Sequence, residues 1–103
     1  MRYVSTRNTT KIYEFKDVFI KGLADDGGLF IPSLLPKYSE KEIQDLKSLN
    51  YSDLAKKIIF PFIGNFMDKN ELSKIIDKSY SVFRRENVID FIKIGDRSVL
   101  ELF

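Results

Sequence analysis

One stretch constrains the fold of this 103-residue chain more than any other: residues 22–32, which read Gly-Leu-Ala-Asp-Asp-Gly-Gly-Leu-Phe-Ile-Pro. The adjacent glycines Gly27 and Gly28 can hold a positive φ at little steric cost and so permit a sharp reversal of the backbone. The apolar run that follows, closed by Pro32, predicts a short buried strand. We therefore expect a structural turn between a helix and a strand, and a valine at Gly27 or Gly28 should destabilise the domain.

The composition bounds the class of protein. Hydrophobic residues make up 44% and charged residues 31% of the chain, which is the balance of one globular domain. Cysteine and histidine are absent, which excludes thiolate nucleophiles, Ser-His and Cys-His pairs and the commonest metal ligands. A net charge of +2 gives no reason to expect a nucleic acid or a membrane as partner. The sequence contains neither a signal peptide nor an apolar run long enough to span a membrane, so we expect a cytoplasmic protein.

Apolar residues at helical spacing predict about four helices. The first begins near Phe15 and ends near Gly22. The second begins at Ser39, because Ser39 and Glu42 have the spacing of a reciprocal capping box. Such a box satisfies two backbone N–H groups that the first turn of a helix would otherwise leave unpaired.

The third and fourth helices should form a helical core. Ser52 is the expected N-cap of the third, whose broad apolar stripe predicts a central helix buried on most sides. Pro61 lies in that stripe and should bend the helix near Phe60. Asp68 starts a further capping box and a fourth helix, which should end at about residues 83–86. The phenylalanines expected in the core are Phe60, Phe62, Phe66 and Phe83.

The remaining ordered segments should be strands, which makes the fold class α+β. Residues 2–5 alternate in character, and residues 29–31 follow the glycine pair. Residues 88–103 alternate on both sides of Gly95-Asp96, a two-residue hairpin signal. We expect one small mixed or antiparallel sheet, made of the first strand, the strand after the glycines and the hairpin, with helices covering it. Its strand order does not follow from the sequence.

The residues by themselves form no catalytic constellation. Asp25 and Asp26 are adjacent carboxylates, but neighbours in a turn seldom converge on one atom, so we interpret them as solvated turn residues. Thr6 and Arg7 lie in a polar segment that can contact an anion through the guanidinium; the alternative is a plain surface loop. The helical lysines lie on expected polar faces, so none stands out as a Schiff-base former. We predict no catalytic, cofactor-binding or metal-binding residue in this chain.

Three pieces of the sequence, in order, resemble the N-terminal domain of threonine synthase, a pyridoxal-phosphate enzyme. Residues 3–7 are similar to the family's opening Tyr-x-Ser-Thr-Arg, residues 22–32 to its Gly-Leu-Ala-x-Asp-Gly-Gly-Leu-aromatic-x-Pro, and residues 100–103 to its Leu-Glu-Leu-Phe. Two positions depart from the pattern, since the family usually has Gly at position 8 and often Pro at position 25. Asn8 also tolerates the left-handed conformation, so we expect the turn there to survive.

The resemblance implies a parent enzyme that uses pyridoxal phosphate to convert O-phospho-L-homoserine and water to L-threonine and phosphate. In the family, Leu-Glu-Leu-Phe is followed by His-Gly-Pro-Thr and then by Ala-Phe-Lys-Asp, whose lysine holds the cofactor. We therefore expect residues 1–103 to be an N-terminal domain truncated before that lysine, inactive alone, with no cofactor bound to it, and with the remainder of the parent chain as partner. Thr6 and Arg7 are then the candidates to face the substrate cleft.

Two alternatives stay open. A stand-alone structural or interaction module would bind a protein partner by adding a strand to the edge formed by residues 97–103. A threonine synthase-like relative with an altered substrate would carry the same motifs, because the residues that select substrate and cofactor lie mostly downstream. Leu100-Glu101-Leu102-Phe103 reads as a strand cut in mid-course, which favours the fragment over the stand-alone module.

Overall fold

In the computed structural model, which describes residues 1–83 and 90–101, the predicted N-terminal strand lies at the centre of a three-stranded sheet. β1 (Arg2–Ser5) pairs antiparallel with β2 (Tyr13–Glu14) on one side and with β3 (Phe30–Pro32) on the other. The rings of Tyr13 and Phe30 pack edge to face with their centroids 4.8 Å apart, which ties the two outer strands together. The sequence did not predict β2, because two residues are too few to show a period.

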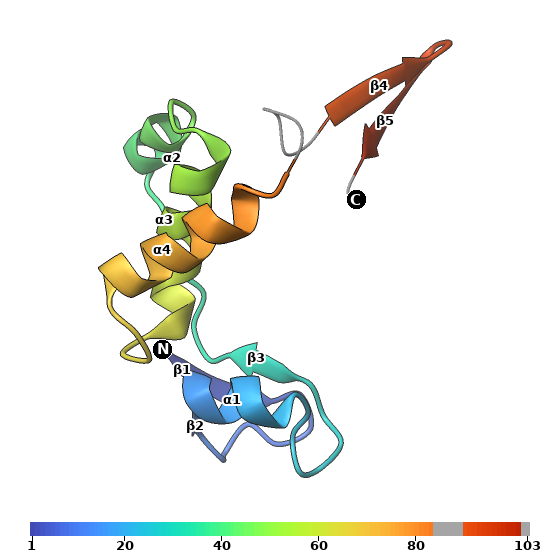
Figure 1. Cartoon of the computed structure of the whole chain (residues 1–103). Helices are drawn as coiled ribbons and strands as arrows, with labels where there is room; N and C mark the ends of the chain where they lie inside the picture. The colour runs from blue at the N-terminus through green and yellow to red at the C-terminus, as the bar shows by residue number, and fades with distance from the viewer. Residues whose placement is uncertain (84–89, 102–103) are drawn as a thin grey trace.

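α1 (Phe15–Lys21) is the helix predicted before the glycine turn, and it lies beside the sheet (Figure 1). Gly22 ends it with a φ of 71°, and the Gly22 N–H donates to the Val18 carbonyl at 3.0 Å. A side chain at this φ would be strained, so a glycine suits the helix end. The chain then enters the turn that leads to β3.

Local capping bonds start the next three helices. α2 (Glu40–Leu46) begins with the predicted box, in which the Ser39 N–H donates to the Glu42 carboxylate at 2.7 Å and the Glu42 N–H donates to Ser39 Oγ at 3.3 Å. α4 (Lys69–Tyr80) begins with the predicted Asp68 cap, which accepts bonds from two backbone N–H groups of the first turn. These helix starts are therefore confirmed.

The expected cap of α3 (Tyr51–Ile63) was wrong. Asn50, not Ser52, is the N-cap, because its side-chain oxygen accepts a 2.9 Å bond from the Asp53 N–H. Ser52 lies inside the helix and donates instead to the Asp77 carboxylate of α4 at 2.9 Å. Pro61 does not divide α3, and the bend expected near Phe60 stays a prediction.

The helical core forms where α3 and α4 pack together, around buried Ile63, Leu72 and Ile76. Of the predicted core phenylalanines, Phe60 and Phe62 are partly buried, whereas Phe66 and Phe83 are 40% and 46% exposed, which corrects their assignment. α3 is accordingly less enclosed than predicted. α4 ends at Tyr80, before the expected end at residues 83–86, of which 84–86 lie outside the described residues.

The C-terminal strands form the predicted hairpin but not the predicted sheet. β4 (Asp90–Ile94) and β5 (Arg97–Glu101) pair antiparallel around Gly95, whose φ is 64°, as a separate two-stranded sheet. The fold class α+β is confirmed, whereas the single sheet that we expected is wrong. The N-terminal sheet offers little room for further strands, since β2 has two residues and β3 contains Pro32. The strand ends expected at residues 88–89 and 102–103 lie outside the described residues.

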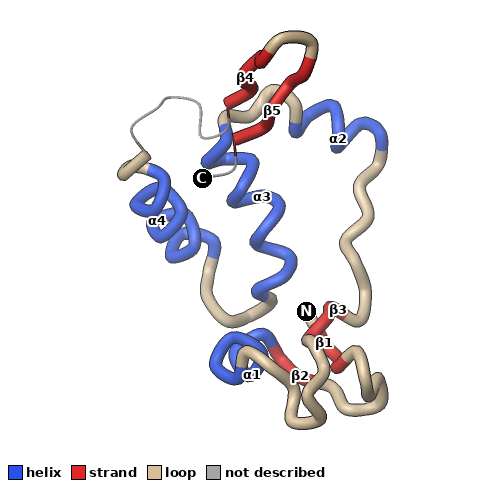
Figure 2. The backbone as a smooth tube through the Cα atoms, turned by 90° about the vertical axis from the view of Figure 1, so that its right-hand side faces the viewer, coloured by secondary structure: helices blue, strands red, loops and turns tan. Residues whose placement is uncertain are grey.

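Figures 1 and 2 place the two sheets at opposite ends of the molecule, with α3 and α4 between them. The radius of gyration is 17.0 Å, compared with about 13 Å for a compact domain of 100 residues. The accessible surface is 8513 Å², whereas a folded monomer of 12.0 kDa exposes about 6,000 Å². The chain thus leaves far more surface exposed than a self-contained domain of its size. Within the described residues, no helix combines the length and apolar character that crossing a membrane requires.

Candidate functional site

The glycine turn is held against the sheet by a buried hydroxyl. Ser5, the last residue of β1, is only 1% exposed. Its Oγ donates a 2.7 Å hydrogen bond to the Asp26 carboxylate and accepts a 3.1 Å bond from the Arg7 N–H. Both hydrogen-bonding capacities of the buried hydroxyl are therefore used within the domain.

Asp26 is an exposed turn residue, as predicted, and its carboxylate is also a structural acceptor. The carboxylate oxygen that accepts from Ser5 also accepts a 2.9 Å bond from the Gly28 N–H. The Ser5 hydroxyl and then the Gly28 N–H stabilise the charged form and lower the pKa of Asp26. An ionised carboxylate is what this arrangement requires, and it is unsuited to proton transfer at neutral pH.

The two glycines of the turn are required for different reasons. Gly27 has a φ of 75°, and an added Cβ would lie 3.0 Å from Arg7 Nη1. Gly28 lacks a positive φ, but an added Cβ would overlap Ser5 Oγ. The first glycine thus provides a backbone conformation and the second provides space for the buried hydroxyl.

Thr6 and Arg7, the candidates to face a cleft, both brace this turn. The Thr6 N–H donates to the Leu29 carbonyl at 2.8 Å, and Thr6 Oγ1 accepts from the Leu29 N–H at 3.0 Å. Arg7 Nη1 donates to the Asp26 carbonyl at 3.0 Å. The structure therefore brings residues 5–7 and 26–29 together into one site, which we call the Ser-Asp turn.

The two residues that depart from the family pattern, Asn8 and Asp25, each form their own local contacts. Asn8 does not use the left-handed conformation that it could tolerate, since among the described residues only glycines have a positive φ. Its side-chain oxygen instead accepts from the Thr10 N–H at 3.0 Å, a local turn that needs no positive φ. Asp25 contacts Lys21 at 2.6 Å and Lys11 at 3.1 Å, and these cations, Lys21 first, lower the pKa of its carboxyl.

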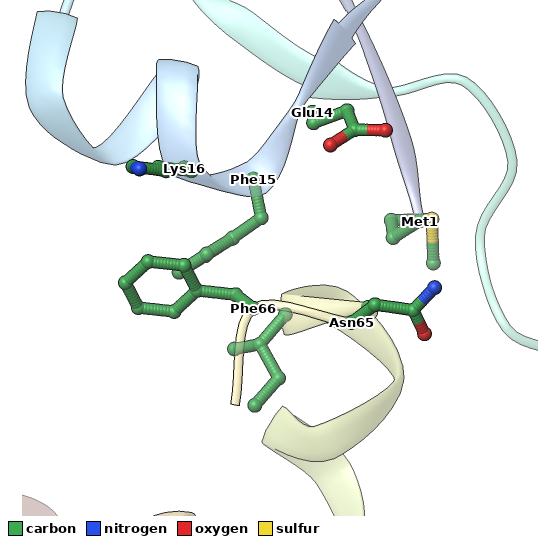
Figure 3. A pocket seen from close by; sticks show the side chains of 8 residues that line it. Met1, Glu14, Phe15, Lys16, Asn65 and Phe66 are labelled. Carbon is green, nitrogen blue, oxygen red and sulfur yellow. The ribbon is translucent and has the colours of Figure 1, made fainter. Parts of the chain in front are cut away.

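A cavity of about 300 Å³ lies where the N-terminal sheet and α1 meet the end of α3 (Figure 3). The rings of Phe15 and Phe66 meet there with centroids 5.4 Å apart, and Glu14, Lys16 and Asn65 lie around them. The cavity is therefore lined by residues from both the N-terminal half of the domain and the end of α3.

A second cavity, of about 440 Å³ between α3 and α4, is lined in part by Lys56 and Lys69. Lys56 lies 2.7 Å from Asp77 and 3.0 Å from Asp53, and the two carboxylates, Asp77 first, raise the pKa of the lysine. Schiff-base chemistry needs the neutral amine, so this shift is in the wrong direction. The Lys69 ammonium lies 5.1 Å from the Phe60 ring centroid as a cation–π contact. No group of three potential metal ligands occurs in the described part of the chain.

The fold and the Ser-Asp turn together define a small α+β domain. Its sequence matches the family Threonine synthase N terminus over residues 2–80, and the chain belongs to this family. It is 38% identical to a threonine synthase of Pseudomonas aeruginosa and 35% identical to human threonine synthase-like 2. Each match covers 100% of this chain but 22% of the relative. The chain thus spans about a fifth of the length of these relatives.

Two solved structures have the same fold. One is a PLP-bound threonine synthase from Brucella melitensis, with a TM-score of 0.90 and 32% sequence identity. The match covers 100% of this chain and 22% of the Brucella chain. The other is threonine synthase from Escherichia coli, with a TM-score of 0.78 and 21% identity over 93% of this chain and 21% of that one. The second likeness, at that low identity, supports the fold alone.

Proposed function

We propose that this chain is the N-terminal domain of a longer threonine synthase, which we call the parent chain. The parent would use pyridoxal phosphate to convert O-phospho-L-homoserine and water to L-threonine and phosphate. The observation that carries this proposal is the likeness, over the whole chain, to a PLP-bound threonine synthase of 32% identity. Pyridoxal phosphate, when bound, serves such a replacement as an electron sink.

We infer that the lysine that holds the cofactor lies elsewhere in the parent chain. A cofactor lysine must be neutral to react, whereas Lys56 is held charged by Asp53 and Asp77. Adding pyridoxal phosphate to the 103-residue chain should therefore give no stable aldimine absorbance. A borohydride-trapped adduct at one specific lysine would contradict this proposal, and a Lys56→Arg variant would show whether that lysine is the site.

Thr6 and Arg7 remain our candidates for residues at the substrate cleft. The bond from Arg7 Nη1 to the Asp26 carbonyl orients the guanidinium, and the Arg7 side chain is otherwise exposed in the described structure. An oriented guanidinium with free N–H groups suits a phosphate, which it can bind with two parallel hydrogen bonds.

Phosphate release from O-phospho-L-homoserine by the parent chain tests the activity and the cleft together. The parent should release phosphate, and Arg7→Lys should raise KM because lysine cannot make the paired bonds. Arg2→Lys is the matched control, since Arg2 is also an exposed arginine of this segment. Equal KM values for both variants would remove Arg7 from the cleft. A parent that binds pyridoxal phosphate but releases no phosphate would contradict the activity.

The altered-substrate alternative has one specific observation in its favour. Relatives named threonine synthase-like 2 match this chain at identities of 30–36%, close to the 38% of the Pseudomonas enzyme. The N-terminal domain therefore does not separate the two groups. Phosphate release from a different phosphorylated amino acid, with none from O-phospho-L-homoserine, would favour this alternative.

A cytoplasmic location also stays a prediction.

A further inference from the structure

Each face of the β4–β5 hairpin carries apolar side chains that the described structure leaves largely exposed. Phe91 pairs with Leu100 on one face, and Ile92 pairs with Val99 on the other. Phe91 is 75% exposed and Ile94 is 64% exposed, and the other apolar side chains of the hairpin are at least 38% exposed. A two-stranded hairpin with no third strand is only marginally stable in water. This hairpin therefore requires cover on both sides.

The two outer edges of the hairpin differ. Because Ile94 and Arg97 flank a two-residue turn, they exchange backbone hydrogen bonds, and the backbone groups of the next pair, Lys93 and Ser98, point outward. Lys93 places a charge on the β4 edge, a common obstacle to strand addition. β5 carries its charges, Arg97 and Glu101, at its two ends, and the residues between them that direct their backbone outward, Ser98 and Leu100, are uncharged and are not proline. The β5 edge is thus open to a further strand.

The edge of the N-terminal sheet provides an internal contrast. In β3 the Leu29 carbonyl and the Ser33 N–H bond to β1, so the alternate residues Phe30 and Pro32 direct their backbone outward. Pro32 has no N–H to donate, which closes this edge to an added strand. Strand addition therefore favours the hairpin over the N-terminal sheet.

The exposed surface area and the comparisons favour one partner for the hairpin, the remainder of a longer chain. The whole chain exposes about 2,500 Å² more than a compact monomer of its mass, which exceeds the roughly 800 Å² that one partner buries in a standard interface. The Brucella enzyme matches the whole of this chain, hairpin included, within a polypeptide of which that match is 22%. A chain of that length contains ample additional residues to cover the hairpin.

We propose that the β5 edge receives a strand from the part of the parent chain that follows this domain, and that apolar side chains of that part cover both faces of the hairpin. The partner rests on the proposed function, because the parent is taken to be a longer threonine synthase. The hairpin is then the attachment point of the domain.

Amide hydrogen exchange, resolved by residue, tests the edge directly. In the parent chain, the Ser98 and Leu100 amides should exchange at least about 100-fold more slowly than in the 103-residue chain. The Val99 amide, which bonds to β4, is the internal reference for an intact hairpin. Equal rates at Ser98 and Leu100 in the two proteins would overturn the proposal. A coding sequence that stops after Phe103 would also overturn it.

Proline substitutions at one cross-strand pair, Lys93 and Ser98, show whether the added strand pairs with β4 or with β5. Ser98→Pro and Lys93→Pro each remove an outward N–H without removing a bond inside the hairpin. Ser98→Pro should lower the melting temperature of the parent chain by several degrees more than Lys93→Pro. Equal losses, or a larger loss for Lys93→Pro, would overturn the assignment to β5. Phosphate release, measured on the same samples, distinguishes this proposal from the proposed activity. A parent chain that releases phosphate but has fast amide exchange at Ser98 contradicts only the strand addition. A parent chain with slow amide exchange at Ser98 that releases no phosphate contradicts only the activity.

Discussion

The hydroxyl of Ser5 donates a 2.7 Å hydrogen bond to the carboxylate of Asp26, although the two residues are 21 positions apart in the sequence. This bond joins the end of β1 to the glycine turn, and hence two of the three segments that resemble threonine synthase motifs. The N–H groups of Arg7 and Gly28 complete the same network. The motifs are therefore two halves of one structural unit.

Removing the Ser5 hydroxyl should destabilise the domain. Ser5→Ala leaves the Arg7 N–H and the Asp26 carboxylate each without one partner, at an expected cost of about 1–2 kcal/mol in the free energy of unfolding. Ser33→Ala is the matched control, because its exposed hydroxyl donates to the Arg2 carbonyl at 3.1 Å. Denaturant titrations of both variants give the comparison. A loss for Ser5→Ala no greater than that for Ser33→Ala would show that the buried bond contributes little.

Space beside Gly28 should be as important as the bond itself. Gly28→Ala places a Cβ against Ser5 Oγ, so the variant should be less stable than the wild type. Combining Gly28→Ala with Ser5→Ala removes the overlapping oxygen, and the double variant should lose less than the two single losses added together. Melting temperatures of the three variants check this. Additive losses would contradict the overlap.

Acid should weaken the Ser-Asp turn. The pKa of Asp26 in the folded chain lies below its ordinary value of 3.8, because the Ser5 hydroxyl and the Gly28 N–H stabilise the carboxylate. A lowered folded pKa gives a stabilisation that is complete well above pH 3.8 and is lost as the pH falls through the folded value. The stability difference between the wild type and Asp26→Asn should therefore narrow from pH 7 toward pH 3 in denaturant titrations. A constant difference over this range would argue against the assignment.

A single hydroxyl also links the sheet to the helical core. The Tyr3 hydroxyl donates to the Phe62 carbonyl at 2.6 Å, across 59 positions of sequence. Tyr3→Phe should cost about 1 kcal/mol in the free energy of unfolding. Tyr38→Phe should be neutral or stabilising, because the buried Tyr38 hydroxyl has no hydrogen-bond partner within the described structure. Calorimetry of the pair checks both signs, and a greater loss for Tyr38→Phe would reverse the interpretation.

Structural features that depend on neighbouring residues could be predicted well from the sequence. The caps at Ser39 and Asp68, the end of α1 near Gly22 and the hairpin turn at Gly95 all appear where the sequence indicated. Each depends on the backbone chemistry of one turn, which neighbouring residues determine. The motifs that resemble threonine synthase belong with these signals, because their family assignment needs no knowledge of packing.

Contacts between distant residues decided the remainder. Ser52 and Asn50 are both good capping residues; Asn50 caps α3 through Asp53, whereas Ser52 donates to Asp77, which only the packing of α4 brings near it. Asp26 is the exposed turn residue that the sequence predicted, and only the tertiary structure shows that β1 brings Ser5 beside its carboxylate.

The sequence by itself thus determined the family, the fold class and the local turns of this protein, since these follow from residue type and spacing. Only the tertiary structure decided that the hairpin stands apart from the N-terminal sheet and that the Ser-Thr-Arg segment closes over the glycine turn. The physical reason is that strand pairing and burial depend on which surfaces meet. For these segments, those surfaces come from residues far apart along the chain.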